Sequence, residues 1–125
     1  MSWYERFNVF GDVAPATRYH DAPAHVHVVH RSPDGRHLTL YSDHPEGVTF
    51  SQPPSGIGET FYVVEGTITA TAPGDEPVVF RAGDVVHWSY DRPLELDYSA
   101  DLRAVCFFWS DDGPLPDFAN GADVV

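Results

Sequence analysis

Two stretches of the sequence decide the fold: Glu59–Gly66, which is ETFYVVEG, and Phe80–Val86, which is FRAGDVV. The first contains an apolar run, Phe61–Val64, that is typical of a strand with both faces buried, and the glycine after it permits a turn or a bulge. The second carries a Gly-Asp pair that opens another apolar strand. The roughly 17 residues from Gly66 to Gly83 hold one hairpin. The sequence therefore predicts strands on both sides of a hairpin.

Short apolar runs between turn residues continue along the whole chain. Eleven prolines and ten glycines together supply 21 of the 125 residues, and they separate these runs. The spacing of about 8–12 residues between turns favours a sandwich or a jelly-roll barrel over an open sheet. The expected strands are His25–His30, Leu38–Ser42, Val48–Gln52, Phe61–Val64, Thr67–Ala72, Val78–Phe80, Val85–Trp88, Leu94–Tyr98 and Arg103–Trp109.

The two ends of the chain differ from this pattern. Ser2 and Glu5 fit a capping box, and Trp3, Phe7 and Phe10 fall on one face of a helix, so the chain begins with either a short helix or an opening strand. Residues 111–125 contain two prolines and two glycines and are expected to form an irregular tail. We expect one domain over residues 1–125, with an N-terminal segment at 1–22 and a barrel at 23–110.

The composition excludes several classes of function. Nineteen acidic residues against seven basic ones give a formal charge of −12, which disfavours binding to nucleic acid and to anionic membranes. All seven basic residues are arginines, so a Schiff-base lysine, a pyridoxal-phosphate anchor and a Walker phosphate loop are excluded. The single cysteine, Cys106, excludes an internal disulfide. The sequence shows neither a secretory signal nor a membrane-spanning run, and we expect a cytoplasmic protein.

The spacing of Glu59, Gly66 and Gly83-Asp84 resembles the motifs of the cupin superfamily, over about residues 48–110. The resemblance implies an all-β fold, the double-stranded β-helix or cupin jelly-roll barrel, and a homodimer. The pattern is similar to the small cupin branch that includes ethanolamine-utilisation and ureidoglycolate-type proteins. Cupins include epimerases, dioxygenases, decarboxylases, lyases, isomerases and binding modules, so the fold alone does not define the activity.

The usual metal site of this family is incomplete here. The two histidines that stand before the family glutamate are replaced by Gln52 and Pro54, and the last histidine is replaced by Pro93. Of four family ligands only Glu59 remains, with Gln52 as a weak oxygen ligand. The cofactor is therefore either absent or one divalent ion in a displaced site.

A displaced site could be built from other histidines. His25 and His27 are two residues apart on an expected strand, so both rings project from one face. Together with Glu59 and His87 they could hold iron, zinc, manganese or nickel. The alternative is an exposed strand face in a histidine-rich part of the chain.

Glu59 and His87 are the candidate acid–base pair. The match of Glu59 to the cupin glutamate suggests that its carboxyl points into the barrel, where a nearby histidine could exchange protons with it. Strand alternation turns either His87 or Trp88 inward, and the sequence does not decide which. The alternative for His87 is a packed core residue.

The residues expected to contact a substrate are Gln52, Phe61, Trp88, Tyr98 and His27. A cavity with aromatic walls suits a flat or cyclic organic molecule. We expect a small-molecule enzyme that catalyses isomerisation, cyclisation, epimerisation or elimination in specialised metabolism. The alternatives are a non-catalytic ligand-binding protein and a metal-dependent, oxygenase-like enzyme.

Overall fold

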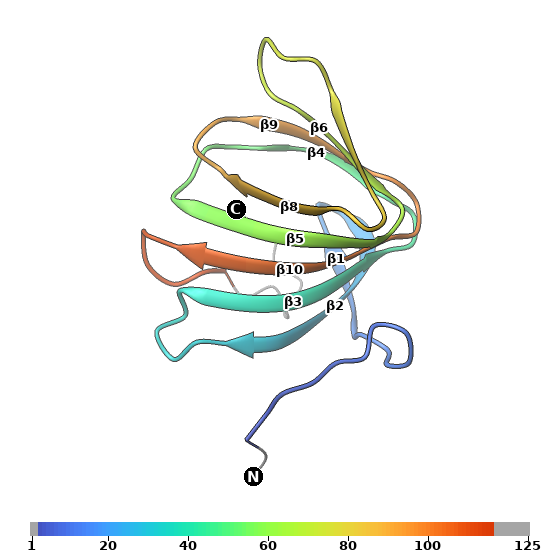
Figure 1. Ribbon diagram of the computed structural model, residues 1–125, viewed down its shortest axis with the longest axis vertical. Coiled ribbons are helices and arrows are strands. Elements are labelled where there is room, and N and C mark those ends of the chain that lie inside the picture. The colour runs from blue at the N-terminus through green and yellow to red at the C-terminus, as the bar shows by residue number, and fades with distance from the viewer. Residues whose placement is uncertain (1–2, 117–125) are drawn as a thin grey trace.

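The computed structural model describes residues 3–116, which form ten strands and no helix (Figure 1). The strands are β1 (Ala16–Tyr19), β2 (Ala22–Arg31), β3 (His37–His44), β4 (Val48–Gln52), β5 (Ile57–Glu65), β6 (Thr67–Thr71), β7 (Val78–Arg81), β8 (Val85–Ser89), β9 (Leu94–Tyr98) and β10 (Leu102–Ser110). The all-β prediction is confirmed. Within the described residues no helix is long and apolar enough to cross a membrane.

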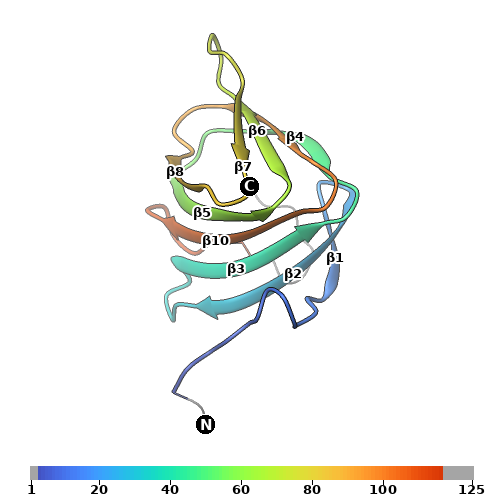
Figure 2. The same cartoon turned by 45° about the vertical axis from the view of Figure 1, so that its right-hand side comes forward.

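The strands form two antiparallel sheets that face each other (Figure 2). The larger sheet has the order β1-β2-β3-β10-β5-β8, and the smaller has the order β4-β9-β6-β7. The chain passes between the sheets at Gly66, whose φ of 80° is a left-handed conformation that favours glycine. A Cβ at this position would lie 2.9 Å from the backbone Cα of Leu102. This arrangement is the predicted jelly-roll barrel.

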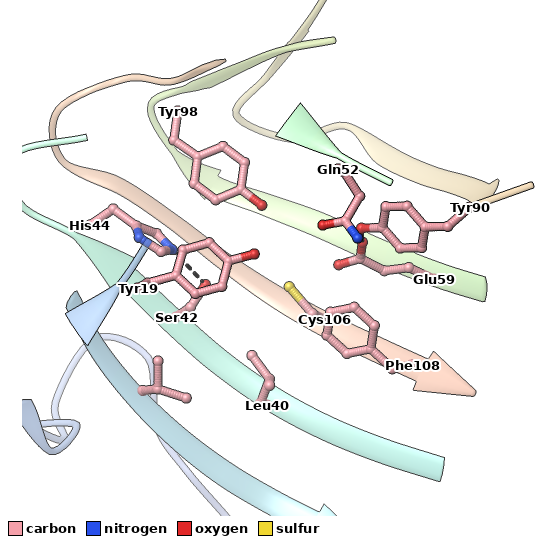
Figure 3. A pocket seen from close by; sticks show the side chains of 11 residues that line it. Tyr19, Leu40, Ser42, His44, Gln52, Glu59, Tyr90, Tyr98, Cys106 and Phe108 are labelled. Carbon is pink, nitrogen blue, oxygen red and sulfur yellow. Dashed lines mark hydrogen bonds between the residues drawn. The ribbon is translucent and has the colours of Figure 1, made fainter. Parts of the chain in front are cut away.

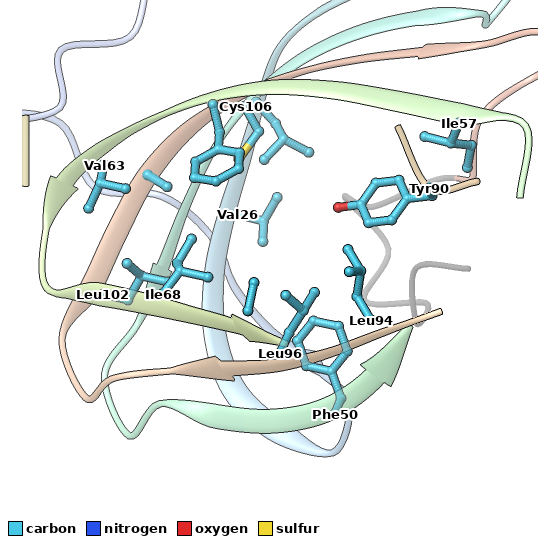
Figure 4. Packing of buried hydrophobic residues seen from close by; sticks show 14 of the residues in the cluster. Val26, Phe50, Ile57, Val63, Ile68, Tyr90, Leu94, Leu96, Leu102 and Cys106 are labelled. Carbon is cyan, nitrogen blue, oxygen red and sulfur yellow. The ribbon is translucent and has the colours of Figure 1, made fainter. Parts of the chain in front are cut away.

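The apolar core fills the space between the sheets (Figure 4). Alternation along each strand produces it: in β9, Leu94 and Leu96 are buried, whereas Glu95 and Asp97 face solvent. Burying a leucine of this size stabilises the fold by roughly 1.5–3 kcal/mol. The two leucines meet inward residues of the opposite sheet, such as Val26.

The first described residues form neither the short helix nor the opening strand that the sequence allowed there. Residues 3–15 contain no helix, and Trp3 and Phe10 are 94% and 84% exposed. Phe7 stacks on His27 and Tyr41 at the outer face of the barrel, and the Arg103 guanidinium lies 5.7 Å from the Phe10 ring centroid. No second element covers the rest of that face, so a helix here would have had little to pack against. Ser2, the expected cap, lies outside the described residues.

One strand was missed, and it lies inside the expected N-terminal segment. Strand β1 pairs with β2 through a two-residue turn at His20 and Asp21, which have φ values of 49° and 64°. Such turns normally carry glycine or asparagine, and neither is present, so no local pattern predicted a hairpin here. At the other end, Leu115 of the expected tail is buried against the barrel, and residues 117–125 lie outside the described range. The single-domain assignment stays a prediction.

Candidate functional site

A small cavity of about 30 Å³ lies between the two sheets (Figure 3). This volume is enough for about two water molecules. Seven strands and the residue that follows β8 contribute to its wall. The lining residues are Tyr19, Val26, Leu40, Ser42, His44, Gln52, Glu59, Tyr90, Tyr98, Cys106 and Phe108.

Glu59 is the buried acid of this cavity. It lies in β5 and is only 5% exposed, and its Oε1 accepts hydrogen bonds from Trp88 Nε1 at 3.1 Å and from the Tyr90 hydroxyl. Burial raises the pKa of the Glu59 carboxyl, and the hydrogen bonds from Tyr90, Trp88 and Cys106 partly oppose that shift. Glu59 therefore keeps its proton to a higher pH than an ordinary glutamate does.

Trp88, not His87, faces inward from β8. In the β5–β8 register Glu59 stands opposite Trp88, and Thr60 stands opposite His87. His87 lies on the exposed outer face, where its Nδ1 is 3.0 Å from the Thr60 hydroxyl and its ring stacks on Trp109. Because neighbouring residues of a strand point to opposite faces, the expected Glu59–His87 pair is not formed.

The displaced metal site is not formed either. Val26 points into the cavity, so His25 and His27 point outward. His25 Nδ1 lies 3.9 Å from Asp43 Oδ2, and the His27 ring stacks on Phe7. The predicted ligands are therefore separated by the sheet itself. Among the described residues, no three His, Cys, Asp or Glu side chains are grouped as a metal site would require. The donor set does not fit a resident metal ion.

The five residues expected to contact substrate divide into three groups. Gln52 and Tyr98 line the cavity. Trp88 does not line the cavity itself, but its indole N–H donates a hydrogen bond to Glu59, which does. Phe61 is only 1% exposed and packs against the Trp88 ring in the core. His27 is on the outer face and cannot contact a molecule inside the barrel.

Tyr90 and His44 were not among the predicted site residues. Tyr90 has the same inward alternation as Trp88, and its hydroxyl contacts Glu59. His44 is two residues after Ser42 on β3, beyond the expected end of this strand at Ser42. Continuing the alternation from Leu40 through Ser42 would have placed His44 in the cavity wall.

The polar groups of the cavity are held in their neutral forms. Burial lowers the pKa of His44 to about 4, with a smaller contribution from the nearby His20. Burial raises the pKa of the Tyr90 and Tyr98 hydroxyls and of the Cys106 thiol. At neutral pH the wall therefore offers hydroxyl, thiol and imidazole groups that can exchange protons next to the Glu59 carboxyl.

Comparison with known proteins agrees with this architecture. Residues 45–91 match the EutQ-like cupin domain family, and no curated protein matches the sequence. The structure of KdgF from Halomonas sp. has a TM-score of 0.64 at 14% identity, over 94% of this chain and 98% of that one. A putative ethanolamine utilization protein Q from Salmonella typhimurium has a TM-score of 0.63 at 17% identity, over 78% of this chain and 80% of that one.

Ectoine synthase from P. lautus is a third structural neighbour. Its TM-score is 0.59 at 17% identity, over 70% of this chain and 64% of that one. At such identities these neighbours establish the barrel fold alone, and they do not assign an activity. The family match covers the segment that contains Glu59, Gly66 and the Gly83-Asp84 pair.

Proposed function

Because the chain is a small cupin related to the EutQ branch, we propose that it binds a small organic metabolite in the barrel and catalyses a proton transfer on it. The reaction class is isomerisation, cyclisation, epimerisation or elimination. The observation that carries the proposal is the buried Glu59 carboxyl, which lies in the cavity wall and accepts hydrogen bonds from Tyr90 and Trp88.

Glu59 is the proton donor and acceptor in this proposal. A carboxyl whose pKa is raised by burial holds a proton that it can deliver to a basic atom of the substrate. When Glu59 becomes a carboxylate, the hydroxyl of Tyr90 and the indole N–H of Trp88 stabilise the negative charge. Such a positioned acid or base typically contributes on the order of 10²–10⁴-fold to the rate.

Gln52 and Tyr98 orient the substrate. Both lie in the cavity wall, and their amide and hydroxyl groups can pair with polar atoms of a bound molecule. The cavity of about 30 Å³ is far below the roughly 300 Å³ of common ligand pockets, so we expect the wall to open on binding. Tyr19 lies on β1, a four-residue strand at the edge of the larger sheet, and its ring packs on Phe50 and Tyr98, so we expect the wall to open where β1 covers the cavity.

A second candidate function is ligand binding without catalysis. The aromatic rings around Tyr98, which lines the cavity, favour it. Phe50 meets the Tyr98 ring edge-on at 5.2 Å between centroids, and His20 stacks on Phe50 at 3.9 Å. Apolar walls with few polar groups are common in simple binding sites. The two candidates differ in whether protons on carbon exchange with solvent.

Solvent deuterium incorporation distinguishes the two functions. The protein is incubated in D₂O with a panel of small carbonyl compounds, hydroxy acids and imines, and each compound is examined by NMR and mass spectrometry. An enzyme incorporates deuterium at carbon and forms product. Glu59→Gln, which keeps the side-chain size, and Tyr90→Phe are the test variants, with circular dichroism to confirm folding.

Each outcome of this experiment is decisive. Deuterium incorporation that Glu59→Gln reduces by about 10² or more supports the enzyme. Binding without incorporation, measured by calorimetry on the same panel, supports the second candidate. Incorporation that is equal in the wild type and in Glu59→Gln overturns the proposed role of Glu59.

We also expect a homodimer. The exposed apolar residues Trp3, Phe10 and Val13 of the N-terminal segment support this expectation, because a second copy of the chain could cover them. Light scattering on the full chain and on Phe10→Ser tests it, and a monomeric wild type would contradict it.

A further inference from the structure

The wall of the cavity carries one carboxyl group and no cationic group in neutral solution. Among residues 3–116, Glu59 is the only acidic residue that lines it. All seven basic residues of the chain are arginines that lie within this described range, and none of them lines the cavity. His44 stays neutral, because burial lowers its pKa to about 4. A bound anion would therefore meet no opposite charge in this cavity.

Oxygen atoms of the wall are placed to accept hydrogen bonds from a ligand. The hydrogen bonds that Trp88 and Tyr90 donate to Glu59 both end on Oε1, and the other carboxyl oxygen points toward the middle of the cavity (Figure 3). The hydroxyl groups of Tyr19 and Tyr98 point into the same space (Figure 3). Carboxyl and hydroxyl oxygens both accept N–H donors. A ligand group with several N–H donors, such as an ammonium or an amidinium, matches this set.

Aromatic rings form much of the remaining wall. The rings of Tyr19 and Tyr98 are nearly parallel, with 7° between their planes and 6.1 Å between their centroids, and Phe108 also lines the cavity. The face of an aromatic ring is electron-rich, so it attracts a cation and repels an anion. The rings and the carboxyl group therefore favour the same sign of charge in a ligand.

The charge of the whole chain acts in the same direction. A formal charge of −12 raises the concentration of cations near the protein and lowers that of anions. This long-range attraction is screened over about 8 Å at physiological ionic strength, whereas a contact with Glu59 inside the barrel is screened much less. The contribution of the cavity and that of the whole chain can therefore be separated by experiment.

We propose that the barrel takes a small organic cation, an ammonium, iminium or amidinium compound, and that Glu59 selects this charge over carboxylates and phosphates. The inference deepens the proposed function and rests on it for the location of the site. The preference for a cation is a property of binding alone. It can be measured whether or not any reaction follows.

A proton that Glu59 holds in the empty cavity does not conflict with this preference. A neutral amine or imine that enters takes the proton on its nitrogen: the O–H bond of Glu59 breaks, an N–H bond forms, and a carboxylate is left beside a cation. When the ligand enters as a cation, the Glu59 proton leaves to water. A buried ion pair is stable only where the remaining polar atoms are hydrogen-bonded, and Tyr90 and Trp88 supply those bonds to the carboxylate.

Three probes of one shape test the preference. Acetamidinium, acetamide and acetate are planar and have the same number of non-hydrogen atoms, but they carry a positive charge, no charge and a negative charge. Each is titrated into the ¹⁵N-labelled full chain at neutral pH and about 0.15 M salt. The indole N–H signal of Trp88 is followed by NMR, because this group donates to Glu59 at 3.1 Å, and Trp88→Phe assigns the signal.

The wild type should bind acetamidinium at least about tenfold more tightly than acetamide, since a hydrogen bond between charged groups is stronger than one between neutral groups by about this factor. Acetate should leave the Trp88 signal unchanged. In Glu59→Gln, acetamidinium and acetamide should bind within about twofold of each other, because the amide has nearly the size of the carboxyl group but cannot carry its charge.

Glu65→Gln is the matched control. Glu65 lies on β5 like Glu59, but its side chain is exposed and does not line the cavity. The variant removes the same charge from the same strand, so it should keep the preference for acetamidinium. Glu59→Asp retains a carboxyl group and should also keep it, which preserves the test if Glu59→Gln fails to fold. Circular dichroism verifies the fold of each variant.

Three results would overturn the proposal. The first is a Trp88 signal that acetamidinium does not shift. The second is binding of acetamide or acetate to the wild type as tight as that of acetamidinium. The third is a preference that is equal in the wild type and Glu59→Gln, or that Glu65→Gln loses as fully as Glu59→Gln does, which would assign it to the charge of the whole chain.

Failure of this inference and failure of the proposed function give different results. Among the compounds of the deuterium experiment, we expect the imines to react and the hydroxy acids not to react. Deuterium incorporation into a hydroxy acid would support the proposed function and overturn the preference for cations. Selective binding of acetamidinium, without incorporation into any compound, would support the preference and contradict the proposed reaction.

Discussion

The two faces of the larger sheet carry different chemistry. On the inner face Glu59 and Cys106 are buried, and Glu59 accepts hydrogen bonds from Trp88 and Tyr90. On the outer face His25, His27 and His87 are partly or fully exposed, and they stack on aromatic rings or face acidic residues. The residues with the most suggestive spacing in the sequence therefore lie outside the barrel. Burial, more than residue type, separates the candidate site from ordinary surface chemistry.

The largest expected difference between the faces is in activity. Glu59→Gln removes the buried ionisable carboxyl and should lower turnover by about 10²–10⁴-fold, whereas His87→Ala should leave turnover within about twofold. The measurement is kcat/KM for the substrate found by deuterium incorporation. A large loss of activity in His87→Ala with normal folding would show that His87, on the outer face, takes part in the mechanism.

Two phenylalanines of the larger sheet give a matched comparison of stability. Phe61 on the inner face is 1% exposed, and Phe107 on the outer face is 45% exposed. Phe61→Ala should lower the free energy of unfolding by about 3–5 kcal/mol, because it leaves a cavity in the core. Phe107→Ala should cost under about 1 kcal/mol. Urea denaturation measures both values, and similar losses would contradict the assignment of the two faces.

Acid titration provides the next comparison. The folded-state pKa of His44 is about 4, below the usual 6.5, so the unfolded chain binds a proton first as the pH falls. His44 therefore destabilises the fold progressively between pH 6.5 and about 4, by about 3 kcal/mol in total. Below that range both states are protonated, and the loss is complete.

His44→Gln isolates this contribution. Glu59 acts in the opposite direction, because its raised pKa gives stability at low pH that is lost as the pH rises through the folded-state value. The Glu59 contribution is common to the wild type and to His44→Gln, and it cancels in their difference. The unfolding free energy of the variant should fall less than that of the wild type on acidification from pH 6.5 to 4. Equal slopes in the two proteins would contradict the burial of His44.

Two glycines extend the comparison from faces to turns. Gly66 and Gly74 both have a φ of 80°, but a Cβ at Gly66 would lie 2.9 Å from the backbone of Leu102, whereas a Cβ at Gly74 would meet nothing within 4 Å. In both alanine variants the left-handed conformation should lower the free energy of unfolding by roughly 1–2 kcal/mol. Gly66→Ala carries the steric contact in addition, so its melting temperature should be the lower of the two. A lower value for Gly74→Ala would contradict the close packing at Gly66.

The strand bounds were predicted best where a proline or a glycine stands next to the strand. Val48–Gln52 lies between Gly47 and Pro53, and the observed strand has the same bounds. Leu94–Tyr98 follows Pro93 and was also placed with its observed bounds. In contrast, β1 was missed because the turn at His20 and Asp21 has no glycine or asparagine to announce it.

The site was harder to predict because it depends on pairing between distant strands. Which of His87 and Trp88 points inward follows from the register of β8 against β5, and no local pattern contains that register. The expected strand ended at Ser42 because Pro45 and Gly47 follow closely, whereas β3 continues to His44. Glu59 could be placed from the resemblance to cupins, whereas Tyr90 required the three-dimensional arrangement.

The cavity wall draws on seven of the ten strands, which has a practical consequence. No fragment of the barrel can contain a complete site, so a molecule that fits it binds only the intact fold. Its binding energy then adds to the stability of the whole chain, by about 2.7 kcal/mol at a ligand concentration 100 times Kd. For a domain of this size that is a rise of several degrees in the melting temperature. Thermal melting across a metabolite library can therefore find the ligand before its reaction is known.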